Sequence, residues 1–297
     1  MKKKAFEIGF NIVMYGFVII MGFVFVFPLL KMISMSFMTV EDLVNPLVTW
    51  IPFEFSTENY EQAILVLGYW ETLLTTIMVS VVPALVQMIS CSLVGYGLAR
   101  YNFKGSKIIF ALVLATFIIP SQITMIPQYV MYKDLKILGS IAAYLLPAAF
   151  GQGFKSAIFI LIFYSFFSQV PPSLVEAAEV DGGNQFTVFF KIAVPIAKPG
   201  FLISFLLSTV WYWNETYLST LYLGADLKTL PVKLATFVEA FNKMMGSSSA
   251  ASSGVGNANE AIQMAGTFLV IAPLLILYAF TQRWFVEGID KSGITGE

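Results

Sequence analysis

The amino-acid sequence predicts an all-α membrane protein with six transmembrane helices. Of its residues, 58% are hydrophobic and 12% are charged, whereas a soluble domain has about one quarter charged residues. The apolar residues form long runs with few charges, and about 20 apolar residues in a helix cross a bilayer. Lys and Arg gather between these runs on alternate sides, which is the pattern that the positive-inside rule describes.

The first run is predicted to be a retained transmembrane helix, within an N-terminal segment of residues 1–30. Three lysines at positions 2–4 precede an uncharged stretch from Ile8 to Leu30. This stretch is longer than the roughly 7–15 apolar residues of a signal peptide, and no small-x-small cleavage site follows it. The lysines therefore place the start of this helix in the cytoplasm.

Five further spans are expected in a core of residues 71–285. Their predicted bounds are Thr72–Ala99, Ile108–Pro127, Ile141–Phe167, Pro199–Leu223 and Ala261–Gln282. Lys155 lies inside Ile141–Phe167, which is the fourth of the six spans, after Gly151-Gln152-Gly153. That helix is therefore either broken there or begins later. The remaining parts are predicted to be extracytoplasmic segments at 31–70 and 224–260, a cytoplasmic loop at 171–199 and a cytoplasmic tail at 286–297.

The distribution of Lys and Arg supports this topology. Of the 17 basic residues, ten fall in the predicted cytoplasmic segments and five in the outside loops, with Lys31 and Lys155 unassigned. The excess on one side predicts that both termini and the 171–199 loop face the cytoplasm. Within the second outside loop, residues 246–256 have the composition of a flexible linker.

The loop at residues 171–199 is a polar, helix-forming island between two apolar runs. Ser173 and Glu176 match a capping box, Ser-x-x-Glu, at the start of a first helix. Asp181 and Gly182, followed by a second glycine, end that helix, because glycine accepts the left-handed conformation of a helix C-cap. Asn184 is placed to cap a second helix. Its apolar positions recur at helical spacing, at Phe186, Phe189, Phe190 and Ile192, and two prolines end it, Pro195 and Pro199.

These residues resemble the EAA loop in the permease subunits of bacterial ABC importers. The positions that match the family's spacing are Glu176, Ala177, Ala178, Gly182, Ile192 and Pro195. Val194 departs from the family's usual leucine but keeps the apolar character. The first outside segment (PLLKMISMSF, TWIPFEFSTENY) and the tail (RWFVEGIDKSGITGE) are similar to carbohydrate-class permeases, in particular to the maltose-type second permease subunit.

The resemblance implies a type I importer fold and a set of partners in a bacterial cell membrane. A cytoplasmic coupling helix within the loop would fit a cleft on an ABC ATPase dimer, which binds ATP and Mg. Glu176 and Asp181 would orient and cap that helix, Gly182 would permit its turn, and Phe189 and Phe190 would anchor it. A second homologous permease subunit would complete the pathway, and an extracytoplasmic binding protein would deliver a sugar or oligosaccharide.

The residue types in the chain argue against an enzyme. There is no histidine and a single cysteine, Cys91, which lies in an apolar run. No Gly-x-x-x-x-Gly-Lys-Ser/Thr phosphate loop occurs, and no Cys/His cluster offers a metal site. We therefore expect a non-catalytic subunit with no cofactor of its own and no nucleic-acid partner.

Polar and aromatic residues within the predicted spans are candidates for substrate contact. The fifth span holds Trp211, Trp213, Asn214 and Glu215, and a carboxylate inside a span is a functional candidate. The alternative is that the aromatic residues form an interfacial belt and that Glu215 caps or pairs with a helix. Two glutamines are weaker candidates, Gln87 and Gln122, because a hydrogen bond between helices also accounts for them.

Three other functions remain open at this level. An ion-driven secondary transporter needs inverted repeats and intramembrane ion ligands, and neither is evident in the sequence. A membrane enzyme lacks its usual catalytic groups here. An importer of glycerol phosphate esters or polyamines is also consistent with the loop. However, the two arginines, Arg100 and Arg283, lie at the cytoplasmic edge and no cluster of carboxylates lines a span, so a neutral sugar is favoured.

Overall fold

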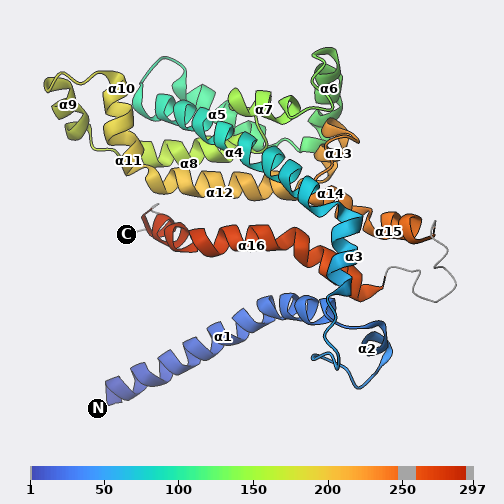
Figure 1. The fold of residues 1–297 in the computed structure, drawn as a ribbon. Helices are drawn as coiled ribbons and strands as arrows, with labels where there is room; N and C mark the ends of the chain where they lie inside the picture. Colours follow the sequence, from blue (N-terminus) through green and yellow to red (C-terminus); the bar gives the residue numbers. More distant parts are fainter. Residues whose placement is uncertain (1, 247–258, 292–297) are drawn as a thin grey trace. The chain divides into compact units, whose positions relative to one another are not determined.

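The computed structural model describes residues 2–246 and 259–291, which are mostly helical and contain no strand. The chain divides into two compact units (Figure 1). Unit 1 comprises Met1–Tyr69 and Leu234–Ala272, and unit 2 comprises Trp70–Lys233 and Pro273–Glu297. The predicted domain boundaries at residues 30, 70 and 285 stay predictions.

Unit 1 contains α1 (Lys2–Ser36), α2 (Val40–Val44), α3 (Glu58–Leu67) and α15 (Phe237–Gly246). The first helix continues past its predicted end at Leu30, because no breaking residue follows before Ser36. Asn59 on α3 donates its amide hydrogens to the Ser36 and Met38 carbonyls at 3.0 and 2.8 Å. These bonds fix α3 against the end of α1, since the last carbonyls of a helix lack partners within it.

Long apolar helices in the described residues make up to six candidate membrane spans. Three of the candidates are single helices that are long and apolar enough to cross a membrane, namely Gly9–Ser36 of α1, α4 (Tyr69–Arg100) and Glu260–Arg283 of α16 (Glu260–Lys291). The other three are bent pairs: α5 (Ser106–Ile118) with α6 (Ser121–Asp134), α8 (Ser156–Ser168) with α9 (Pro172–Val180), and Gln185–Ile196 with α12 (Lys198–Asn214). The all-α fold with six predicted spans is confirmed at this level.

Three of the predicted spans are interrupted. The third, expected at Ile108–Pro127, bends by 99° between α5 and α6, because Pro120 forces the preceding residue out of the helical conformation. The fourth consists of α7 (Ala142–Ala149) and α8, separated by a loop that ends at Lys155. The fifth ends at Asn214 instead of Leu223, since Glu215 is extended before α13 (Tyr217–Leu223).

Unit 2 places its polar segments at two opposite ends. In Figure 1, α6 and α13 lie at one end of this unit, and α9, α10 (Gln185–Val188), the π-helix η1 (Phe189–Ala193) and α11 (Val194–Ile196) lie at the other. Between the ends, α8 packs against both α5 and α12. Gly95 of α4 lies so close to α8 that a Cβ there would be 2.6 Å from the Phe163 Cβ.

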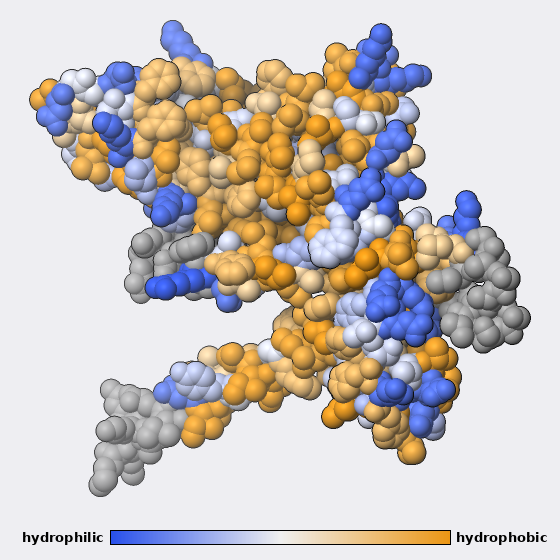
Figure 2. Space-filling model, in the orientation of Figure 1, coloured by the Kyte–Doolittle hydropathy of each residue, from blue (hydrophilic) through white to orange (hydrophobic). Residues whose placement is uncertain are grey.

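The surface of unit 2 is apolar between these ends (Figure 2). Large exposed side chains such as Ile108, Leu112 and Phe117 cover α5, and Leu74, Ile89 and Leu93 cover α4. Soluble monomers rarely expose an apolar patch of this extent. The surface therefore has the character of one that faces lipid or another membrane subunit. The short helix α14 (Leu230–Ala235) follows α13 in the chain.

Candidate functional site: a coupling loop and a central cavity

The predicted coupling helix is α9, and its start differs from the prediction. Pro171 is the N-cap residue and no side chain caps the helix, so Ser173 and Glu176 do not form the expected capping box. Proline at the first helical position needs no hydrogen-bond partner and has a helical φ. Pro172 therefore begins α9 two residues earlier than predicted and places Ser173 inside the first turn.

The end of α9 depends on two glycines, as the sequence predicts. Asp181 is the C-cap, Gly182 has φ +81°, and the Gly183 amide donates to the Ala178 carbonyl at 2.8 Å. Such a left-handed residue favours glycine, because a Cβ costs energy there. A Cβ on Gly183 would lie 2.7 Å from the Ala178 carbonyl oxygen. The two glycines therefore turn the chain tightly for different reasons.

The second helix of the loop is attached firmly to unit 2. The Asn184 side chain accepts a hydrogen bond from the Thr187 amide at 2.8 Å, which is the predicted N-cap. Phe189 is buried, with its ring centroid 4.9 Å from that of Tyr96 and 6.0 Å from that of Phe167. Phe190 is 61% exposed, so only Phe189 of the expected pair packs into this core. The loop is thus joined to α4 and α8 by aromatic packing.

Both helices of this loop carry exposed apolar side chains, which together are called its exposed apolar surface. Val180 is 88% exposed, and Leu174 and Phe186 are also exposed. A chain of hydrogen bonds runs from the Tyr101 hydroxyl to Gln185 Oε1 at 2.9 Å, and from Gln185 Nε2 to Glu179 Oε1 at 3.4 Å. These bonds connect the two loop helices and the residue that follows α4.

The predicted coupling residues differ in burial. Glu176, Ala177 and Asp181 are exposed, and so is Pro195 in α11, whereas Ala178 and Ile192 are half-buried. Their role at an ATPase stays a prediction.

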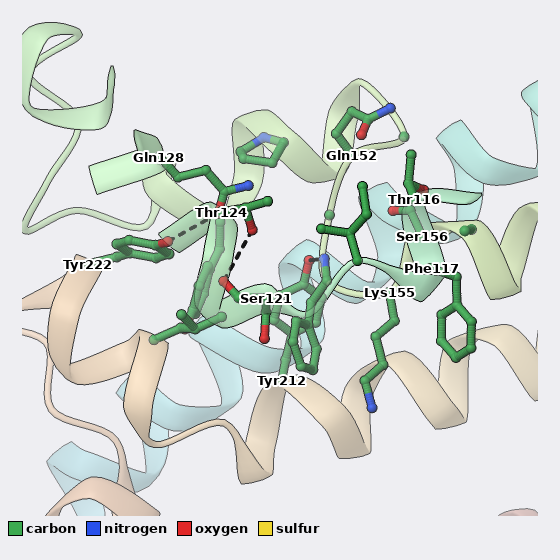
Figure 3. Close-up of a pocket in the computed structure, with 18 of the residues that line it drawn as sticks. Thr116, Phe117, Ser121, Thr124, Gln128, Gln152, Lys155, Ser156, Tyr212 and Tyr222 are labelled. Carbon is green, nitrogen blue, oxygen red and sulfur yellow. Dashed lines mark hydrogen bonds between the residues drawn. The ribbon is translucent and has the colours of Figure 1, made fainter. Parts of the chain in front are cut away.

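A partly open pocket of about 530 Å³, called the cavity below, lies in unit 2 (Figure 3). All three breaks in the predicted spans contribute to its wall. Pro120 and Ser121 come from the α5–α6 bend, residues 151–156 from the α7–α8 loop, and Tyr212 and Leu218 from either side of the α12–α13 break. Broken helices within a membrane place backbone polar groups along a cavity, as transporter binding sites do. The cavity is therefore the candidate substrate site.

Gln87 fixes the loop between α7 and α8. Its side chain is fully buried in α4 and donates to the Phe154 carbonyl at 2.8 Å and to Ser156 Oγ at 2.9 Å. Its Oε1 accepts from Ser208 Oγ on α12 at 3.1 Å. This geometry matches the alternative interpretation of Gln87, a hydrogen bond between helices. Contact with substrate by Gln87 stays a prediction.

Tyrosine hydroxyls complete this part of the wall. The Phe154 amide donates to the Tyr212 hydroxyl at 3.2 Å, and the Tyr144 hydroxyl lies 2.9 Å from Ser219 Oγ. A Cβ on Gly153 would be 2.6 Å from the Tyr212 hydroxyl, so glycine is needed for this close approach. On the other side, the Tyr222 hydroxyl donates to Gln128 Oε1 at 3.1 Å (Figure 3).

Of the residues predicted for substrate contact, Gln122 lines this cavity, whereas Gln87, Trp211, Trp213, Asn214 and Glu215 do not. Trp213 is 3% exposed, and its Nε1 has no hydrogen-bond partner among the described residues. The Asn214 amide donates to the Val210 carbonyl at 2.9 Å. The Glu215 carboxylate accepts from the Leu218 amide at 2.9 Å and so caps α13, as the alternative interpretation has it. Trp211 is half-buried and packs against Phe159.

Sequence reasoning missed Lys155 as a site residue. Its side chain extends from the loop toward α12, with Nζ 4.5 Å from the centre of the Trp211 ring (Figure 3). The signal was present, because Lys155 is the single charged residue between Lys136 and Glu176. An ionisable residue inside an apolar run is a functional candidate.

The described geometry can be compared with known proteins. Residues 91–291 match the family model described as "Binding-protein-dependent transport system inner membrane component". The chain belongs to this family. It is 32% identical, over 97% of its own length and 98% of the relative, to the polygalacturonan/rhamnogalacturonan transport system permease protein YtcP of Bacillus subtilis.

Other matches agree with this assignment. The permease subunit is 31% identical to the arabinooligosaccharides transport system permease protein AraQ of Halalkalibacterium halodurans, over the whole of both chains. Its fold is similar, with a TM-score of 0.75 and 22% identity, to a chain from the crystal structure of a bacterial ABC transporter involved in the import of the acidic polysaccharide alginate. That match covers 93% of this chain and 96% of the other.

Proposed function

We propose that this inner membrane component forms half of the translocation pathway of an ATP-driven importer for oligosaccharides. The observation that carries the proposal is that the 171–199 loop is attached to helices of the membrane core. Its exposed apolar surface is attached through Phe189 to α4 and α8, and residues of α8 line the cavity. A displacement of the loop would therefore move the cavity wall as a rigid body.

The chemistry of ATP belongs to a partner in this proposal. ATP and Mg are bound by a separate ABC ATPase dimer, which the α9 surface contacts. A second, homologous permease subunit covers the other side of the pathway, and an extracytoplasmic binding protein delivers the substrate. The chain itself is not catalytic, lies in a bacterial cell membrane and keeps both termini in the cytoplasm, as the distribution of Lys and Arg supports.

An oligosaccharide is supported as the substrate by two observations. The relatives named above are permeases for polygalacturonan or rhamnogalacturonan and for arabinooligosaccharides. The cavity volume of about 530 Å³ lies within the range of about 300–1,000 Å³ typical of small-molecule sites. Its wall combines aromatic faces with hydroxyl and amide groups, which suits sugar rings with apolar C–H faces and hydroxyl edges.

Affinity purification of the tagged chain from its native membrane tests the proposal. A second six-span subunit and an ATPase with a phosphate-binding loop should co-purify, and the complex in liposomes should take up oligosaccharide only with ATP and the binding protein. A chain that purifies alone and moves solute under an ion gradient would support the secondary transporter instead.

A further inference from the structure

Lys155 occupies an unusual place in unit 2. It is the N-cap residue of α8 and has φ +56°, one of two such left-handed non-glycine residues among those described. Residues other than glycine pay a cost in this conformation. The turn directs the lysine from the loop toward α12 (Figure 3). The loop conformation is in turn fixed by Gln87, which bonds to Phe154 and Ser156 on both sides of Lys155.

The Lys155 ammonium has no carboxylate partner in the described part of the chain. Its contacts are the ring faces of Trp211 at 4.5 Å and Phe154 at 5.3 Å from Nζ, both within the about 6 Å range of a cation–π contact. Lys155 is also the single charged residue among those lining the cavity. The Lys155 side chain is exposed in this single subunit, and an ionisable residue within a predicted span is a functional candidate.

Other residues along the cavity wall contribute groups that favour an anion with hydroxyls. The wall holds the side-chain amides of Gln122, Gln128 and Gln152 and the hydroxyl of Thr116, which both donate and accept hydrogen bonds. The first turn of α8, at Ser156, also lines the cavity, and the N-terminal end of a helix favours negative charge. A carboxylate-bearing sugar satisfies the cation and these polar groups together.

We propose that the cavity takes an oligosaccharide with uronic acid units and that the Lys155 ammonium binds a carboxylate of the sugar. This inference rests on the proposed function and specifies its substrate class. It differs from the sequence-based preference for a neutral sugar, which considered arginines and clustered carboxylates but not Lys155. A neutral sugar would leave the ammonium without an anion when the pathway closes, and a polyamine would be repelled by it.

The test compares acidic trisaccharides with their carboxyl-reduced counterparts. The complete importer, with its binding protein, is reconstituted in liposomes, and uptake of trigalacturonate and trimannuronate is measured beside that of galactotriose and mannotriose. The variants are Lys155→Gln and Lys155→Arg. Lys136→Gln is the matched control, because Lys136 also has φ +56° but does not line the cavity. Direct binding of trigalacturonate to the complex in nanodiscs without the binding protein removes selection by that protein.

Lys155→Gln should weaken binding and uptake of the acidic sugars by roughly tenfold to a hundredfold, the range for a hydrogen bond to a charged group. Lys155→Arg should retain most of the activity, and Lys136→Gln all of it. Equal binding of trigalacturonate by Lys155→Gln and wild type would overturn the inference. Wild-type uptake of the neutral trisaccharides alone would also overturn it but leave the proposed function standing, whereas uptake of neither kind of sugar would contradict both.

Discussion

Replacement of Gln87 by leucine tests how the cavity wall is fixed. The side chain is fully buried and makes hydrogen bonds with Phe154, Ser156 and Ser208. Leucine has a similar size, so the variant removes three bonds without leaving a large void. At about 0.6 kcal/mol for each hydrogen bond between membrane helices, Gln87→Leu should lower the free energy of unfolding by about 2 kcal/mol.

Thermal unfolding of the purified importer complex in nanodiscs, followed by tryptophan fluorescence, measures this loss. With about 2–4 °C for each kcal/mol in a domain of this size, Gln87→Leu should lower the Tm by about 4–8 °C. The control is Gln122→Leu, because Gln122 is exposed and lines the cavity. If the two variants melt together with the wild type, the three hydrogen bonds do not hold the loop and the reasoning fails.

Three further variants test the coupling loop and span five. Gly182→Val should reach the membrane in normal amounts but abolish uptake, since a β-branched residue does not readily adopt φ +81°; normal uptake would contradict the turn's role. Asn184→Ala should remove the cap on α10, cost about 1 kcal/mol and lower the sugar transported for each ATP hydrolysed, with Asn184→Ser restoring it. Trp213→Phe removes a buried N–H that has no partner among the described residues, so the variant should be as stable as the wild type or more stable by up to about 1–3 kcal/mol, with a Tm that is unchanged or higher. Lost uptake at normal stability would instead indicate that the indole contacts substrate.

The coupling loop could be predicted in detail because its signals are local. Gly182 and Asn184 specify a turn and a cap through their own backbone and side-chain chemistry, within a few residues of sequence. The error at the start of this loop was also local. Pro172 and Ser173 compete to begin α9, and proline prevails because it has a helical φ and has no N–H that would need an acceptor.

The cavity could not be predicted in the same way. Gln87 bonds to groups that lie 67 to 121 residues away in the chain, and no sequence pattern pairs them. Glu215 was expected inside a long span, but the chain leaves the helix there and the carboxylate caps α13. Lys155 carried a signal, its isolation in an apolar run, yet only the left-handed turn shows that it reaches Trp211 and the cavity.

The central claim is that the α9 surface contacts an ABC ATPase, and crosslinking tests it most directly. Cys91 is first replaced by serine, and a single cysteine is then placed at Val180 and labelled with a maleimide–benzophenone reagent in native membranes. The matched control is Val130→Cys on α6, which is also exposed but lies at the opposite end of unit 2 (Figure 1). We predict that Val180→Cys captures a protein with a phosphate-binding loop and that Val130→Cys does not. Capture of such an ATPase at neither position, or equally at both, would contradict the account.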